Sequence, residues 1–320
     1  MTGQGYLHQG GGKAAPNSEA RYTHGHERAV LQSHGERTAA NSAAYLLPHL
    51  RQGMSVLDVG CGPGSITLDL AETVAPGRAI GVDAIDAPLE TARAKAAERG
   101  DSLTTFTRGD IMALDYPDHS FDVVHDHHVL QHLSNPIGAM REMLRVCKPG
   151  GIVAARDADY GGMFWYPELS ELEQWRVLYH EIARANGGEP DAARHMRSWA
   201  QEAVEHMEGN SLRFSGAVTA PVPGSALDQP SEGAGNRDNR SSTPRIEVSS
   251  STWIYATPES AEHWGRSQAN RIGGQTFRKQ AAQFGLTERD VDAIAHAWRT
   301  WGASPDATFV IPHVEILIHL

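Results

Sequence analysis

A strand-like run that ends in an acid and a glycine-rich turn is the strongest constraint on how this chain folds. Residues 55–67 read Ser-Val-Leu-Asp-Val-Gly-Cys-Gly-Pro-Gly-Ser-Ile-Thr, so Asp58 is followed by Gly60, Gly62 and Gly64. Glycine at these positions lets the chain turn sharply and lets a ligand approach the backbone. The helical pattern that follows would present its free first-turn amides to whatever lies over the loop. The segment therefore predicts an α/β unit with a nucleotide-type cofactor site.

The spacing of the glycines separates two classes of cofactor. The dinucleotide fingerprint, G-x-G-x-x-G, needs a glycine at the position that Ser65 occupies here. An acid two residues before the first glycine suits a ligand with an ammonium or hydroxyl donor, because a carboxylate repels phosphates. The segment resembles motif I of the class I S-adenosylmethionine-dependent methyltransferases, which is an acid, any residue, and then G-x-G-x-G.

Further elements of the same family follow in order along the chain. Residues 78–82 read as a second strand that ends at Asp83, and an acid about 20 residues past the glycines is where a ribose hydroxyl pair is bound. The resemblance implies that the Asp110 carboxylate accepts the adenine amino hydrogen and that Ile111 lies on the ring. It implies S-adenosyl-L-methionine as the cofactor, bound by Asp58, Gly60, Gly62, Gly64, Asp83, Ala84, Asp110, Ile111 and His125.

The order of the remaining elements indicates the fold class. A fourth strand at 120–125, a helix that begins at Val129, a Pro-Gly-Gly turn and a fifth strand at 152–156 continue the resemblance, which covers roughly residues 50–160. It implies a Rossmann-like α/β methyltransferase fold: a mostly parallel seven-stranded sheet with helices on both faces and a helical cap. The branch that the chain resembles includes ubiquinone and menaquinone biosynthesis methyltransferases, a likeness that transfers fold and cofactor better than substrate.

Composition and pattern divide the chain into six segments. They are a flexible tail at 1–20, a helical segment over the cofactor site at 21–50, the cofactor-binding core at 51–160, a helical cap and substrate region at 161–216, a disordered insertion at 217–245, and the remaining strands with inserted cap helices at 246–320. The insertion is rich in Ser, Gly, Pro and Asn and lacks aromatic residues, so it cannot bury enough apolar surface to offset ordering. In the last segment we expect helices at 258–285 and 287–302 and a closing strand at 309–320.

Two stretches supply candidate walls for a methyl-acceptor site. Residues 157–166 leave the fifth strand at the edge where ligands bind in open α/β sheets, and they contain Tyr160 and Trp165. Residues 253–271 contain Trp264. Flat apolar surface suits a ring-bearing or lipid-like acceptor, although packing of a cap helix explains these aromatics equally well. The N-terminal helical segment adds three polar candidates for contacts to either ligand, Tyr22, His34 and Arg37.

Histidines gather at the end of the fourth strand, where a general base would lie near the acceptor. His127, His128 and His132 are candidates, because a neutral imidazole near pH 7 suits removal of a proton from a hydroxyl. His128 and His132 also stand one helical turn apart, as metal ligands do, but no H-E-x-x-H pattern is present. Helix capping explains any one of them as well. The sequence leaves the base unassigned and predicts no metal site.

Charge and cysteine content argue against several kinds of partner. The chain has 28 Lys and Arg against 39 Asp and Glu, a formal net charge of −11, which disfavours nucleic acid. Its two cysteines, Cys61 and Cys147, fit a reducing compartment. Residues 1–20 lack the apolar run of a signal or anchor, and 309–320 is too short to span a bilayer. We therefore expect a cytoplasmic protein with no membrane span, and the oligomeric state stays open.

Together these patterns predict an S-adenosylmethionine-dependent methyltransferase that acts on O, C or N of a small metabolite, such as a quinone or a secondary-metabolite ring. The sulfonium already activates the methyl group, so the protein chiefly holds the acceptor in line and excludes water. This requirement explains why the sequence shows a strong cofactor motif but no recognisable catalytic motif. Two alternatives remain: a regulatory protein that binds the cofactor without turnover, and a nucleotide-dependent oxidoreductase, whose third glycine is missing.

Overall fold

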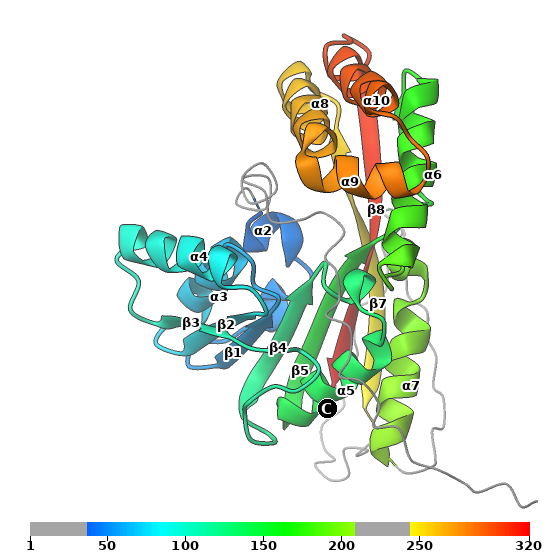
Figure 1. Cartoon of the computed structure of the whole chain (residues 1–320). Helices are drawn as coiled ribbons and strands as arrows, with labels where there is room; N and C mark the ends of the chain where they lie inside the picture. The colour runs from blue at the N-terminus through cyan, green and yellow to red at the C-terminus, as the bar shows by residue number, and fades with distance from the viewer. Residues whose placement is uncertain (1–36, 209–243) are drawn as a thin grey trace, which may run out of the picture.

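The computed structural model describes residues 37–208 and 244–320, and its centre is a twisted eight-stranded sheet (Figure 1). The strand order is β3-β2-β1-β4-β5-β8-β6, and β7 pairs with the other edge of β8. The strands are β1 (Ser55–Val59), β2 (Arg78–Asp83), β3 (Thr104–Arg108), β4 (Phe121–His127), β5 (Cys147–Ala158), β6 (Phe164–Tyr166), β7 (Arg245–Tyr255) and β8 (Thr308–His319).

Strand direction confirms the expected mostly parallel sheet. Strands β1 to β5 pair in parallel, and β8 runs antiparallel to β5, β6 and β7. The structure adds an eighth strand to the seven expected. This strand, β6, forms because β8 extends past its pairing with β5, and the backbone groups of 308–310 then pair with 164–166.

Helices cover both faces of the sheet (Figure 1). On one face lie the N-terminal α2 and η1 with α3 and α4, packed on strand residues such as Val56 and Phe106; on the other lie α5 and α7, packed on Leu57 and Val153. These elements are α2 (Ala39–Ser42), η1 (Leu47–His49), α3 (Ser65–Val74), α4 (Asp86–Arg99), α5 (Pro136–Val146) and α7 (Met196–Glu208), with two 3-10 turns, η2 (Leu130–His132) and η3 (Ala192–Arg194).

The expected helical cap stands beyond the carboxyl ends of the parallel strands, around the projecting end of β8 (Figure 1). Its helices are α6 (Ser170–Ala185), α8 (Pro258–Gly273), α9 (Gln275–Gln283) and α10 (Glu288–Gly302). Trp298 and Trp301 of α10 are fully buried and pack on Phe309 of β8 at ring-centroid distances of 5.3 and 5.7 Å. Burial of rings of this size is the main apolar contribution that holds the cap on the sheet.

Two expected helices differ from those in the structure. The helix expected from Val129 is only the 3-10 turn η2, because Pro136 has no backbone N–H and begins a separate helix, α5, capped by the Asn135 side chain on Gly138 N. The helix expected over 258–285 is broken into α8 and α9, since Gly274 adopts an extended backbone (φ −69°, ψ 154°) between them.

Part of the expected organisation lies outside the described residues. This holds for the 1–20 tail, for Tyr22 and His34, and for the insertion except residues 244–245, of which Arg245 begins β7. Of the N-terminal helical segment, the described part, 37–50, packs against α3, where Ala39 N donates to the Asp69 carboxylate at 2.9 Å. The division of the chain into six segments stays a prediction.

The turn between β1 and α3 needs glycine for two different reasons. At Gly64 (φ +75°) an added Cβ would lie 2.6 Å from the Ala92 Cβ and 2.7 Å from the Phe106 ring. At Gly62 (φ +53°) an added Cβ would meet nothing within 4 Å. One position is closed by packing, and the other faces open space.

This contrast predicts unequal stabilities for two alanine variants. Gly64→Ala should lower the free energy of unfolding by roughly 3 kcal/mol, because overpacking adds to left-handed backbone strain. Gly62→Ala should cost only the strain, about 1 kcal/mol. Urea unfolding followed by circular dichroism measures both, and equal losses would contradict the packing argument.

Candidate functional site

The carboxyl ends of β1, β2, β3 and β4 meet at one edge of the sheet and bring the predicted cofactor residues together. The strand register aligns Val59 with Val82 and Asp83 with Arg108. The backbone amides of Gly60 and Cys61 both donate to Val82 O, at 2.7 and 3.0 Å. The glycine turn is thus fastened to the end of β2, beside Asp83.

Asp83 holds the glycine turn from the neighbouring strand. Its carboxylate accepts hydrogen bonds from Gly62 N and from Ile85 N, each at 3.0 Å. The half-exposed carboxylate lies beside the open space at Gly62, and the adjacent Ala84 is exposed. A donor-bearing ligand could therefore reach an anion that is already oriented by two backbone amides.

Asp110 and Ile111 follow β3 at the same edge. Asp110 is exposed and accepts a hydrogen bond from Met112 N at 2.9 Å, which fixes its carboxylate in a tight turn. Ile111 is 8% exposed and presents a small apolar surface beside it. The pair offers a hydrogen-bond acceptor and an apolar contact next to each other.

Asp58 and His125, near the carboxyl ends of β1 and β4, are buried and bind each other. The Asp58 carboxylate is buried and accepts from Thr67 Oγ1 at 2.5 Å and from His125 Nδ1 at 2.7 Å. His125 has no exposed surface. Both carboxylate oxygens therefore have protein partners, whereas His125 Nε2 is buried without a hydrogen-bond partner among the described residues. Direct contact of these two residues with the cofactor stays a prediction. They tie the first turn of α3 to β1 and β4.

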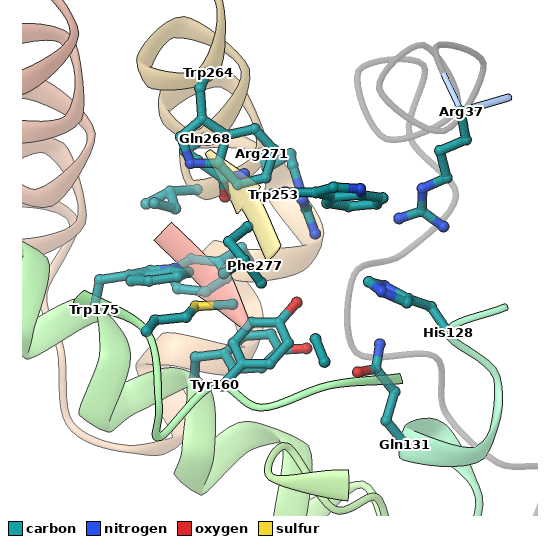
Figure 2. Close-up of a pocket in the computed structure, with 15 residues that line it drawn as sticks. Arg37, His128, Gln131, Tyr160, Trp175, Trp253, Trp264, Gln268, Arg271 and Phe277 are labelled. Atoms are coloured by element: carbon teal, nitrogen blue, oxygen red, sulfur yellow. The ribbon is translucent and has the colours of Figure 1, made fainter. Parts of the chain in front are cut away.

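A cavity opens between the sheet edge and the cap, and six of its 15 lining residues are Phe, Tyr or Trp (Figure 2). The loop after β5 contributes Tyr160, and Trp264 comes from α8, so two of the three predicted substrate residues line it. Trp165 does not; its ring stacks on Phe309 at 5.7 Å in the cap core. The full lining is Arg37, His128, Gln131, Ala158, Tyr160, Met163, Trp175, Tyr179, Trp253, Trp264, Gln268, Arg271, Ile272, Phe277 and Ile311.

Of the three candidate bases, only His128 lines this cavity. Its backbone is left-handed (φ 59°), and its ring stacks on His127 at 4.3 Å and on His313 at 4.9 Å. His127 is buried, and His132 Nε2 is held 3.1 Å from the Gln131 amide nitrogen, a contact that a neutral ring accepts. Within the described part of the chain, no group of three His, Cys, Asp or Glu side chains is arranged to hold a metal ion.

Burial keeps these imidazoles neutral. It is the largest cause that lowers the pKa of His127 and His128 well below the usual value, and it lowers that of His132 to about 3. The positive charge of Arg37 lowers all three further. Each ring is therefore unprotonated at pH 7, the form that accepts a proton.

A buried ionic group positions Trp253 in the cavity wall. Arg156 is 1% exposed and donates to Ser251 Oγ at 3.1 Å, and its guanidinium lies 3.4 Å from the Glu315 carboxylate. The guanidinium also lies 4.9 Å from the Trp253 ring centre, a cation–π distance. The indole N–H of Trp253 donates to Asn41 O at 3.0 Å, which links the wall to the N-terminal segment.

Comparison with known proteins decides the family. A family model described as a methyltransferase domain matches residues 50–210. An uncharacterized methyltransferase of Schizosaccharomyces pombe is 34% identical, over 94% of this chain and 97% of its own length. The chain belongs to the methyltransferase-domain family. The expected enzyme class and cofactor are confirmed with it: this is an S-adenosylmethionine-dependent methyltransferase.

Two further relatives have names that describe an activity. A probable methyltransferase of Aspergillus luteorubrus is 28% identical over 95% of this methyltransferase and 99% of its own length. A demethylmenaquinone methyltransferase of Lactococcus lactis is 37% identical, but over 38% of this chain and 48% of its own length.

Among residues 37–208 and 244–320, every helix falls short of the length and apolarity that a membrane crossing requires.

In this methyltransferase Asp191 fastens the loop after β5, which carries Tyr160, to α6. Its Oδ1 accepts from Gly161 N at 2.6 Å and lies 2.9 Å from His180 Nε2. Burial raises the pKa of Asp191, but the hydrogen bond and charge of His180, with the Gly161 amide, outweigh it and leave the pKa below the usual value. The anion is therefore the form that the fold stabilises.

Asp191→Asn should lower the free energy of unfolding at pH 7 by roughly 2 kcal/mol, because hydrogen bonds to a charged group are lost. The folded-state pKa is lowered, so this stabilisation is present above the unfolded value of 3.8 and disappears as pH falls through the folded value. Urea unfolding of both proteins at pH 7 and at about pH 3 should show the difference shrink. Asp306→Asn, on an exposed turn, is the matched control, and a pH-independent difference would contradict the assignment.

The sequence patterns missed several residues of the cavity. Trp175 and Tyr179 of α6, Phe277 of α9 and Gln268 of α8 all line it. They carry no motif, and helical spacing in an amphipathic pattern indicates only that they are buried. Arg37, which was a candidate for contacts to either ligand, lines the cavity together with them.

Proposed function

We propose that this methyltransferase transfers the methyl group to a small, ring-bearing organic molecule held in the aromatic cavity. The observation that carries the proposal is the position of that cavity beside the glycine turn. Val129, between the cavity residues His128 and Gln131, packs so closely on Gly60 that no side chain fits there. A ligand in the cavity and a ligand over the glycine turn would therefore be neighbours.

For the cofactor we propose direct roles for four of the predicted residues. Gly62 leaves room for close approach, Asp83 would bind the ribose hydroxyls, and Asp110 and Ile111 would hold the adenine. Gly60 and Gly64 would shape the turn, and exposed Ala84 would lie at its rim. When bound, S-adenosylmethionine supplies a methyl group already activated by the sulfonium. The chain's own task is to hold the acceptor in line and exclude water.

For proton removal we propose His128. Its ring faces the cavity, and its Nε2 is buried without a hydrogen-bond partner among the described residues. A neutral imidazole with a low pKa is a weak base, which suffices for a proton that becomes strongly acidic as the methyl group arrives. His127 and His132 would support its position. Transfer to O, N or C remains open, and a quinone or secondary-metabolite ring is one class of acceptor that fits the aromatic walls.

Metabolite comparison tests the proposal. Extracts of cells with and without the gene are compared by mass spectrometry for a pair of aromatic metabolites that differ by one methylene. The purified protein should then convert the lighter member to the heavier and release S-adenosylhomocysteine. Cofactor binding without product from any such pair would favour the regulatory alternative. The cytoplasmic location and the exclusion of nucleic acid stay predictions from the sequence.

A further inference from the structure

Two arginines from distant parts of the chain point into the aromatic cavity. Arg37 immediately precedes the cap residue of α2, and Arg271 lies in the last turn of α8. Figure 2 shows Arg37 entering the cavity on the same side as His128, and Arg271 extending toward them from α8. None of the 15 lining residues, all within the described part of the chain, is Asp or Glu. The lining residues therefore include two cationic side chains and no carboxylate.

The positive charge lowers the pKa of the histidines around the cavity. After burial, the charges of Arg37 and Arg271 are the causes that lower the pKa of His132. Arg37 also lowers the pKa of His128 and of His313. The charges of the two arginines thus reach the cavity wall, in a chain whose formal net charge is −11. Two cations that enter one cavity favour an anionic ligand there.

Polar atoms in the wall indicate further contacts to a ligand. Among the described residues, Gln131 Oε1, His128 Nε2 and Trp264 Nε1 are buried without a hydrogen-bond partner. Buried polar atoms are nearly always paired in folded proteins. A ligand with both donor and acceptor groups on one ring would pair with them.

We propose that the acceptor is an aromatic acid, whose ring lies between the aromatic walls and whose carboxylate, or other anionic group, is bound by Arg271 and Arg37. This inference rests on the proposed function and names the substrate class of the same cavity. Guanidinium matches a carboxylate because its planar fork donates two parallel hydrogen bonds. The surrounding indole and phenol rings supply stacking surface for the acceptor ring.

Two probes with the same ring system, one anionic and one neutral, separate the contribution of the carboxylate to binding from that of the ring. The full chain is saturated with S-adenosylhomocysteine and titrated calorimetrically with 2-naphthoate and with the neutral 2-naphthamide. The carboxylate should bind at least about tenfold more tightly, as expected for charge-assisted hydrogen bonds. Arg271→Gln should bring the two affinities together by weakening naphthoate alone, and Arg37→Gln should act in the same direction.

Arg266→Gln is the matched control, since Arg266 lies on the exposed face of the same helix and pairs with Glu262. It should leave both affinities unchanged. Equal binding of the two probes, or a preference that survives in both cavity variants, would overturn the charge inference alone. Failure of both probes to bind a chain that still binds S-adenosylhomocysteine would overturn the ring-binding cavity, and the proposed acceptor site with it.

Discussion

Asp83→Ala should raise the dissociation constant for S-adenosylmethionine by at least about a hundredfold, because hydrogen bonds to a charged group are each worth roughly 1.5–3 kcal/mol. Two effects combine in this variant. The proposed ribose contact is lost, and so is the carboxylate that holds Gly62 N and Ile85 N at 3.0 Å. Isothermal titration calorimetry of the purified protein measures the affinity directly.

Two further variants sharpen this result. Asp83→Asn keeps an oxygen that can accept from one of the backbone amides, so it should lose less affinity than the alanine variant. Asp86→Ala removes an exposed neighbour that pairs with Arg108 at 3.3 Å and should leave binding unchanged. Wild-type affinity in Asp83→Ala, with unaltered thermal unfolding, would remove the ribose assignment.

His128→Asn should lower kcat about a hundredfold while the affinity for S-adenosylmethionine stays unchanged, as expected for loss of a general base. Asparagine is the substitution of choice, because the backbone at His128 is left-handed and asparagine tolerates that region. The rate is measured as S-adenosylhomocysteine release with the acceptor found by metabolite comparison. His119→Asn is the matched control, since His119 has the same backbone conformation (φ 58°) and lies outside the cavity lining.

The pH profile gives this prediction a second readout. The pKa of His128 is lowered by burial first, then by the charges of His127 and Arg37, so the ring loses its proton below pH 6.5. Activity should therefore hold steady as pH falls through the usual histidine range and should decline only at more acidic values. A wild-type kcat, or an acid limb centred near 6.5 that vanishes in His128→Asn, would contradict the assigned base or its protonation state.

The cofactor edge of the sheet could be predicted from the sequence because its signals are local. The glycine turn, Asp83 and Asp110 each directly follow a short strand, and parallel strands bring their carboxyl ends to one edge. The roles of Asp58 and His125 could not be predicted the same way. They stand 67 positions apart and bind each other, and a motif alone does not say whether a carboxylate meets a ligand or a neighbouring side chain.

The cavity proposed for the acceptor depends on contacts that no local pattern contains. Trp253 donates to the backbone of Asn41 across 212 positions, and Arg37, just before α2, converges with Arg271 of α8. Amphipathic spacing in a cap helix indicates a buried face, but the same spacing fits a core contact and a ligand contact. The structure distinguishes them: Trp175 lines the cavity, whereas Trp298 and Trp301 fill the cap core.

Strand β8 passes without interruption from the sheet, where it pairs with β5, into the cap, where it pairs with β6. One continuous backbone thereby sets the distance between the edge proposed to bind the methyl donor and the helices proposed to bind its acceptor. Helices α8 to α10 form an excursion between β7 and β8. Selection for a new acceptor can therefore change the sequence of α8 to α10 while the geometry of the donor site stays constant. Substrate choice can then evolve independently of reaction type.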